Sequence, residues 1–229
     1  MKKGDFLLID YVGRVTETNE IFDLTNEETA KKENVRIDGQ RYGPMPVIIG
    51  AGMIIKGVDT RLENMQLGKE ETFTLETAEA FGPRDPKMIR IISKAQFLKQ
   101  NINPIPGSFV NIDSMRAKVQ AVSGGRVRVD FNDPLAGKRV TYTVTIKRVV
   151  TETSEKVKFI LKRYGLEAEV AFNAQTKEAA ITTKEPVKEQ VQKILQNMIK
   201  EWIPEVATMK FEAKKQESKE TVPEKPLEK

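Results

Sequence analysis

Where most enzymes offer nucleophiles and bases, this sequence offers apolar and aromatic side chains. It contains no histidine and no cysteine. Their absence excludes Ser-His and Cys-His nucleophile pairs, thiolate chemistry, a disulfide framework and the commonest zinc ligand. We therefore expect no metal site and no cofactor. Any reaction that this chain catalyses should need no proton shuttle.

The segment from residue 47 to residue 82 has the pattern of a small concave unit with apolar walls. Apolar residues recur at helical spacing over 58–65, and Gly68 stands where a C′ glycine would end that helix. Residues 72–76 then alternate in the manner of a half-buried strand. The segment ends at Phe81, an aromatic residue before Gly-Pro that we expect to be exposed.

The chain before this unit predicts two strands and a surface helix. Residues 3–15 alternate between two faces as a first strand, and Ile21 begins a second. Thr25 and Glu28 have the spacing of a capping box, so we expect a short surface helix that runs to Asn34.

After residue 85 the composition changes and short strands predominate. We expect four strands here, at 88–92, 108–112, 117–122 and 126–131. A short helix should lie at 94–100, between the first two strands. Gly124-Gly125 between the last two strands predicts a hairpin turn. The pattern indicates a small β-rich module, after which residues 140–146 alternate as a further strand.

The last third of the chain predicts a compact α+β domain over residues 153–212, with its elements in the order helix, strand, strand, helix, strand. Gly165 should end the first helix. Pro186 should occupy the first turn of the second helix, whose apolar stripe ends at Trp202. Residues 213–229 are rich in Lys, Glu and Pro and are predicted to be disordered.

The charge pattern indicates a solvated surface with many ion pairs. The net charge is +5 and the pI about 9.2, but Lys and Glu are interspersed along nearly the whole chain. We therefore expect no nucleic-acid partner, although nucleic-acid binding stays open as an alternative that rests on the pI alone. No apolar run approaches the roughly 20 residues of a membrane span, so we expect a cytoplasmic protein without a membrane partner.

Four motifs occur in a fixed order along the chain. They are Asp10-Tyr11-Val12-Gly13-Arg14, Ile21-Phe22-Asp23, Gly52-Met53-Ile54-Ile55-Lys56-Gly57 and Asn132-Asp133-Pro134-Leu135-Ala136-Gly137-Lys138. Together they resemble the FKBP-type peptidyl-prolyl cis–trans isomerases, and the last motif is similar to that of the SlyD-type branch. The resemblance as a whole implies a member of the large SlyD-like archaeal kind. SlyD-type proteins often carry a His-rich metal-binding tail, and this sequence departs from that pattern. The resemblance covers about residues 1–150.

The resemblance implies an α+β fold, in which an FKBP-like antiparallel sheet wraps on a short helix. It implies a discontinuous isomerase domain, 1–85 plus 133–152, interrupted by an inserted β-rich chaperone domain at 86–132. The α+β domain at 153–212 carries no recognisable catalytic constellation. The apolar stripe of its second helix either covers the domain's own sheet or serves self-association, and we expect a homodimer through this domain.

The resemblance also assigns residues to the site. The expected catalytic positions are Tyr11, Phe22, Asp23, Ile55, Phe81 and Tyr142. The expected substrate-binding positions are Ile54, Val58, Met45 and Val47 beside the pocket, and Met88, Ile89, Ile91 and Phe97 in the insertion. Asp23 matches the aspartate beside the reacting amide, and Ile55 matches a residue whose backbone N–H binds the ligand carbonyl. Val58 replaces a common tryptophan and Phe81 a common tyrosine, so we expect weak binding of macrolide inhibitors.

Prolyl isomerisation is a reaction that a chain without His or Cys can catalyse. No bond is made or broken, and the barrier of about 18–20 kcal/mol is the double-bond character of the amide. An apolar pocket can lower it by binding the twisted amide, which has lost part of its resonance dipole, better than either planar form. The expected substrates are unfolded or partly folded polypeptides that contain X-Pro bonds.

Two questions stay open from the sequence. The pocket is either an active isomerase site or a vestigial one in a holdase that works through the insertion alone. The apolar residues of the insertion form either its core or an exposed, Met-containing face that binds unfolded chains.

Overall fold

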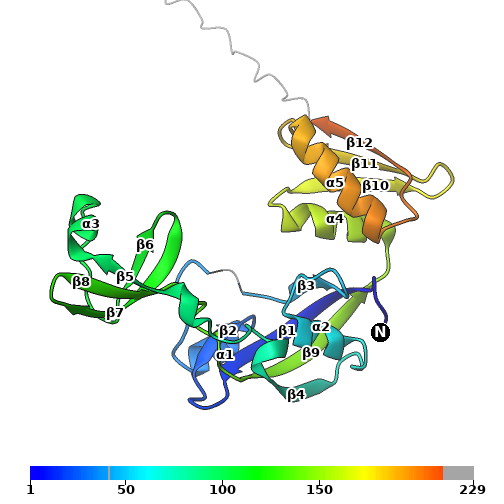
Figure 1. Ribbon diagram of the computed structural model, residues 1–229. Helices are drawn as coiled ribbons and strands as arrows, with labels where there is room; N and C mark the ends of the chain where they lie inside the picture. The colour runs from blue at the N-terminus through cyan, green and yellow to red at the C-terminus, as the bar shows by residue number, and fades with distance from the viewer. Residues whose placement is uncertain (41, 214–229) are drawn as a thin grey trace, which may run out of the picture. The chain divides into compact units, whose positions relative to one another are not determined.

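The computed structural model describes residues 1–40 and 42–213, which fold into helices and mostly antiparallel sheets (Figure 1). The chain divides into two compact units, Met1–Arg148 and a second that begins at Val149. The first contains a five-stranded and a four-stranded sheet, and the second a three-stranded sheet. The expected α+β class is confirmed. Within the described ranges, no helix is long and apolar enough to cross a membrane.

The five-stranded sheet has the order β2-β1-β9-β4, with β3 paired to β1. Its strands are β1 (Phe6–Val15), β2 (Ile21–Leu24), β3 (Met45–Ile48), β4 (Glu70–Leu75) and β9 (Val140–Val150). Burial alternates along β1 and β9, as it does in a strand with one covered face. This alternation buries Tyr11 and Tyr142 together with the aliphatic residues of the same strands.

Helix α2 (Lys56–Leu62) packs its buried residues close to the strand β4. A Cβ added at Gly57 would lie 2.7 Å from the Leu75 side chain, so glycine permits the close approach. The predicted role of Gly68 as the C′ residue is wrong, because α2 ends well before it. Gly68, at a φ of 76°, donates its N–H to the carbonyl of Ile146 at 2.9 Å in the turn that enters β4.

Helix α1 (Glu27–Lys32) begins one residue later than the predicted capping box requires. Its N-cap is Asn26, whose side-chain oxygen accepts a hydrogen bond from the Thr29 N–H at 2.9 Å. The Thr25 hydroxyl is buried and instead accepts the backbone N–H of Tyr11 at 2.9 Å. Thr25 therefore ties the start of α1 to β1 rather than capping the helix.

The segment between β4 and β9 forms the four-stranded sheet, in the order β5-β8-β7-β6. Its elements are two short 3-10 helices, η1 (Thr77–Glu79) and η2 (Pro86–Met88), then β5 (Ile89–Ser93), α3 (Lys94–Lys99), β6 (Phe109–Ile112), β7 (Met115–Ser123) and β8 (Arg126–Asp130). The predicted hairpin is confirmed: Gly124 and Gly125 join β7 to β8 with φ values of 53° and 74°. Phe97 packs with alternate residues of β6, β7 and β8 to form a core.

The second unit has the predicted order of elements. They are α4 (Thr153–Arg163), β10 (Ala168–Asn173), β11 (Glu178–Thr183), α5 (Glu189–Trp202) and β12 (Thr208–Ala213). Gly165 follows α4 with a φ of 73°, as expected. The predicted start of α5 at Pro186 is wrong, because the N-cap is Lys188. Nearly all of the predicted disordered tail, residues 214–229, lies outside the described residues.

Candidate active site

Aromatic side chains from separate segments of the chain form one connected ring cluster. Tyr11 on β1 lies with its ring centroid 5.7 Å from that of Tyr142 on β9. Phe22 on β2 meets Tyr142 and Phe81, which follows η1, edge to face at 5.7 Å in both cases. Edge-to-face contacts of this kind are favourable arrangements for aromatic pairs. The structure therefore brings together four of the side chains expected at the catalytic positions.

Gly13 on β1 makes room for one ring of this cluster. A Cβ at this position would lie 2.7 Å from the nearest atom of the Phe22 ring, which is closer than side-chain packing allows. Gly13 also faces Asp23 in the β1–β2 register, immediately before the register shifts. The sequence identified Gly13 only as part of a motif and missed this packing role. Its absence of a side chain positions Phe22 against β1.

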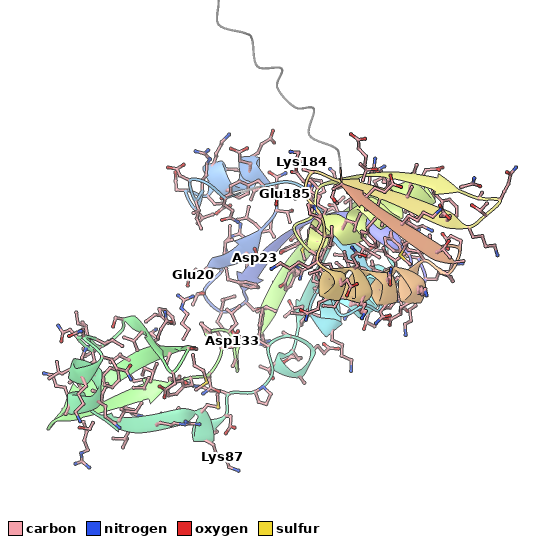
Figure 2. All side chains as sticks on the ribbon, turned by 90° about the horizontal axis from the view of Figure 1, so that it is seen from above. Glu20, Asp23, Lys87, Asp133, Lys184 and Glu185 are labelled. Carbon is pink, nitrogen blue, oxygen red and sulfur yellow. The ribbon has the colours of Figure 1, made fainter. Side chains whose placement is uncertain are left out.

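The Tyr11 hydroxyl donates a 2.6 Å hydrogen bond to the carboxylate of Asp23 (Asp23 is labelled in Figure 2). Burial raises the pKa of Tyr11 far above its usual value, and the hydrogen bond and charge of Asp23 add to the effect. Burial, followed by the charge of Asp23, also raises the pKa of Tyr142. Both phenols therefore stay protonated at neutral pH, and Tyr11 remains a donor to Asp23.

A hollow of about 170 Å³ adjoins the ring cluster at Phe22 and Asp23. Its far side is formed by Val35, Ile37 and Tyr42, from the segment between α1 and β3. The Tyr42 hydroxyl accepts a hydrogen bond from the backbone N–H of Ile37 at 2.9 Å. Sequence reasoning missed these residues. Their signal was a pair of isolated apolar side chains in an otherwise polar stretch.

The other expected pocket residues lie around α2 and β3. Ile54 and Ile55 are half-buried directly before α2, and Ile55 is its N-cap. No hydrogen bond to the Ile55 N–H occurs within the described part of the chain, so this donor is available to a ligand carbonyl. Val47 and Val58 are fully buried, whereas Met45 is half-buried on β3. The two valines are core residues of this unit.

The residues expected to bind clients in the insertion differ in exposure. Ile91 on β5 is 67% exposed, and Met88 and Ile89 are half-buried. Phe97 is only 2% exposed and belongs to the core of the four-stranded sheet. The burial of Phe97 assigns it to packing, so its expected role in binding substrate finds no support in the structure.

The arrangement can hold an apolar ring against aromatic faces, beside a carboxylate whose position is fixed by a hydrogen bond. In residues 1–40 and 42–213, no group of three or more acidic side chains is placed to hold a metal ion. What the site offers is shape, apolar surface and one fixed negative charge.

Two family models match the chain. One, described as FKBP-type peptidyl-prolyl cis-trans isomerase, matches residues 1–98, and the other, described as FKBP26, IF domain, matches residues 90–135. The chain is 31% identical over 155 residues to a short-type peptidyl-prolyl cis-trans isomerase of Methanocaldococcus jannaschii. That alignment covers 68% of this chain and 98% of that protein.

Bacterial relatives match a smaller share of this chain. An FKBP-type 16 kDa peptidyl-prolyl cis-trans isomerase of Escherichia coli is 26% identical over 56% of this chain and 87% of that protein. The SlyD isomerase of Treponema pallidum is 30% identical over 53% of this chain and 70% of that protein. The aromatic site and these similarities lead to one conclusion: the chain belongs to the FKBP-type family of peptidyl-prolyl cis–trans isomerases.

Proposed function

We propose that the ring cluster, together with Asp23 and the Ile55 N–H, is the site at which this isomerase rotates X-Pro bonds. The observation that supports this most strongly is the connected packing of side chains from β1, β2, β9 and the loop after η1. These segments lie far apart in the sequence, and their aromatic residues match the family positions one by one. The expected roles of Ile54, Val58, Met45 and Val47 in shaping the pocket remain part of the proposal.

The mechanism is preferential binding of the twisted amide. The proline ring would pack against the aromatic side chains, which exclude water from the amide. The Ile55 N–H would hold a carbonyl of the substrate. A twisted amide carries less negative charge on its oxygen than a planar one, so the carboxylate of Asp23 disfavours the planar forms more. Because no proton moves, the unionised Tyr11 and Tyr142 can serve entirely as walls and donors.

We also propose that residues 86–132 form a chaperone domain that binds unfolded chains. Ile91, Leu98 and Ile105 are each more than half exposed, an unusual density of apolar surface for so short a segment. Binding there would hold the client near the isomerase site, and tethering raises its local concentration. The corresponding boundaries of the isomerase domain are 1–85 plus 133–152.

The test compares two activities in the same variants. Phe81→Ala and Tyr142→Ala should slow prolyl-peptide isomerisation and proline-limited refolding by about ten- to hundredfold, because a misplaced substrate loses its alignment. Suppression of aggregation should stay close to that of the unmodified protein. Phe172→Ala, on β10 in the second unit, is the control for loss of a half-buried aromatic residue.

A holdase with a vestigial pocket is the second candidate, favoured by the exposed apolar residues of the insertion. It predicts no prolyl-peptide turnover in the unmodified protein, with aggregation still suppressed. Loss of both activities in Phe81→Ala would argue against separate sites.

We propose that the unit beginning at Val149 makes a homodimer. Ile194 on α5 is 51% exposed, and Trp202 at the end of the same helix is partly exposed. A large aromatic residue and an exposed aliphatic one on the same helix provide anchoring surface for a partner. Sedimentation of a monomer at micromolar concentration would remove this idea. The expected cytoplasmic location is testable by cell fractionation.

A further inference from the structure

Residues 86–132, here called the inserted segment, have a charge balance unlike that of the chain as a whole. The segment contains eight Lys or Arg residues, two Asp residues and no Glu. The complete chain is nearly balanced, with 38 basic and 33 acidic residues. Such local asymmetry is masked in the overall net charge, and it indicates a surface with an anionic partner.

Four of the eight cations of the inserted segment lie on the solvent side of its sheet. Along β8, arginines alternate with the buried Val127 and Val129, and β7 has the same alternation around Ala117 and Val119. The exposed cations are Arg116 and Lys118 on β7 and Arg126 and Arg128 on β8, which together we call the basic face. None of these four side chains makes an ion pair with another residue of the described ranges.

The acidic residue at one end of this face is already neutralised. Burial alone would raise the pKa of Asp130, but hydrogen bonds from Asn132 and the Arg84 guanidinium outweigh it and hold the pKa below its usual value. Gln120 donates to the same carboxylate at 3.0 Å. Asp130 is therefore occupied within the chain, and the four cations remain available.

Exposed apolar side chains are interspersed with these cations. Ile91 on β5 lies opposite Arg128 in the strand register and is 67% exposed. Phe109 on β6 lies opposite Lys118 and is 43% exposed. The Arg116 guanidinium stacks 4.3 Å from the centroid of the Phe109 ring. The face thus offers positive charge and apolar contact within the same few strands.

We infer that the basic face binds stretches of client polypeptide that carry both acidic and apolar side chains, an inference that rests on the proposed chaperone role. Charge complementarity selects an anionic partner. A single-stranded nucleic acid fits less well, because its bases need free aromatic faces. Phe109 is the exposed aromatic residue of this face, and the Arg116 guanidinium already stacks on its ring. The aliphatic Ile91 suits a polypeptide side chain better than a base.

The basic face is continuous with the approach to the ring cluster. A hollow of about 210 Å³ is lined by Phe109 and Lys118 on one side and by Pro134, Ala136 and Lys138 on the other. The loop that contains Pro134 starts at Asp133 (labelled in Figure 2). The N–H of Gly137 in this loop donates to the carbonyl of Gly82 at 2.8 Å, next to Phe81. A client bound on the basic face would thus lie one loop away from the proposed site of rotation.

The test measures binding of three fluorescent peptides to the full chain by anisotropy. They share one length and one set of apolar residues, and their polar positions are Glu and Asp, Gln and Asn, or Lys and Arg. The acidic peptide should bind at least about tenfold more tightly than the neutral one at low salt, and the preference should shrink in 0.5 M salt. Equal affinity for the three peptides would overturn the inference.

Variants locate the effect on the face. Arg126→Gln with Arg128→Gln should weaken binding of the acidic peptide by roughly three- to tenfold and leave the neutral peptide unaffected. Lys87→Gln with Lys99→Gln removes the same charge from η2 and from the end of α3, away from the basic face, and should change neither affinity. An equal loss in both double variants would also overturn the inference, since it would indicate a general charge effect.

Two further measurements test the basic face separately from the proposed isomerase site. Turnover of a short, uncharged prolyl peptide should be unchanged in Arg126→Gln with Arg128→Gln, because that assay needs only the ring cluster. If the unmodified protein turns over no peptide, the proposed isomerase site fails while peptide selection stays measurable. A twelve-nucleotide oligouridylate serves as the competing anion. If it binds more tightly than the acidic peptide and depends on the same arginines, the polypeptide assignment is overturned in favour of nucleic acid.

Discussion

The 2.6 Å hydrogen bond between Tyr11 and Asp23 joins β1 to β2 inside the ring cluster. It gives the two residues different tasks: the phenol orients the carboxylate, and the carboxylate adds to the effect of burial, which raises the pKa of the phenol. The Tyr142 hydroxyl makes no side-chain hydrogen bond with any residue of the described ranges, although its ring is buried. Two tyrosines in one cluster therefore provide an internal comparison.

Tyr11→Phe should lower kcat/KM for a prolyl peptide by roughly three- to tenfold and unfolding free energy by about 1 kcal/mol, because a single hydrogen bond is lost. Tyr142→Phe removes a hydroxyl without a partner and should change both quantities much less. Peptide kinetics and urea titrations of the two variants measure these two quantities. Equal losses in both would mean that the hydrogen bond to Asp23 has no special role.

The raised pKa values of these phenols predict a loss of stability at alkaline pH. Below pH 10 the folded and unfolded states both keep the tyrosine protons, so the buried tyrosines contribute fully to the unfolding free energy. Above pH 10 only the unfolded state loses these protons. The unfolding free energy should then fall by at most about 1.4 kcal/mol per pH unit for each buried tyrosine. Urea titrations between pH 8 and 11 should give a shallower fall for Tyr11→Phe. Identical slopes would contradict the prediction.

Gly13→Ala tests whether the missing side chain positions Phe22. The added methyl group would overlap the ring, so unfolding free energy should fall by about 1–3 kcal/mol and isomerisation should slow. In the double variant Gly13→Ala with Phe22→Leu, the smaller side chain should restore part of the stability but not the activity. A fully active Gly13→Ala protein would remove Gly13 from the account of the site.

Local sequence patterns predicted which helices and strands exist, and in what order, better than they predicted where each element begins and ends. The strands β1 and β9 and the hairpin at Gly124 followed from alternation and turn chemistry, which are local properties. The errors at Thr25 and Gly68 have a different origin. Each residue has the right type for a local cap, but a partner distant in the sequence, Tyr11 or Ile146, takes the bond that a cap would have used.

In the candidate site, too, the sequence predicted local features but not contacts between distant residues. The motifs identified the aromatic residues because their types and order along the chain carry the resemblance. The reason for Gly13 could not be predicted, because it depends on the position of the Phe22 ring across two strands. The burial of Phe97 could not be predicted either. Periodicity cannot distinguish a core side chain from an exposed one in a helix as short as α3.

Asn132 fixes the place where the chain returns from β8 toward β9. Its amide accepts the N–H of Asp85 at 2.8 Å, and donates to the Asp85 carbonyl at 3.0 Å and to Asp130 at 2.7 Å. The two ends of the inserted segment are thus held side by side by one side chain. Under the proposed chaperone role, we expect this connection to set how firmly a bound client is held near the ring cluster.

Asn132→Ala should slow proline-limited refolding of an unfolded protein by roughly two- to fivefold, because a loosened connection lowers the effective concentration of the bound client. Turnover of a short prolyl peptide should not change. Asn111→Ala, an exposed residue of β6, is the matched control. If refolding and peptide turnover fall together in Asn132→Ala, the bond network supports the fold rather than the coupling.

The chain is longer than the short archaeal relative, because their alignment covers 98% of that protein but only 68% of this chain. The alignment spans 155 residues and nearly all of that relative. A protein of about that length is therefore itself a member of the isomerase family. The division of the structure after Arg148 agrees with such a limit. The unit from Val149 onward should therefore be dispensable for rotation of an X-Pro bond.

A chain that ends after Glu152, two residues beyond β9, should fold and turn over a short prolyl peptide within about twofold of the full chain, because compact units of this size fold alone. Sedimentation should show a dimer for the full chain and a monomer for the shortened one. The shortened chain should also keep its preference for the acidic peptide, since the basic face lies entirely before residue 132. An unfolded or inactive product would mean that the isomerase part depends on the second unit. An active dimer would place the self-association surface in the first unit.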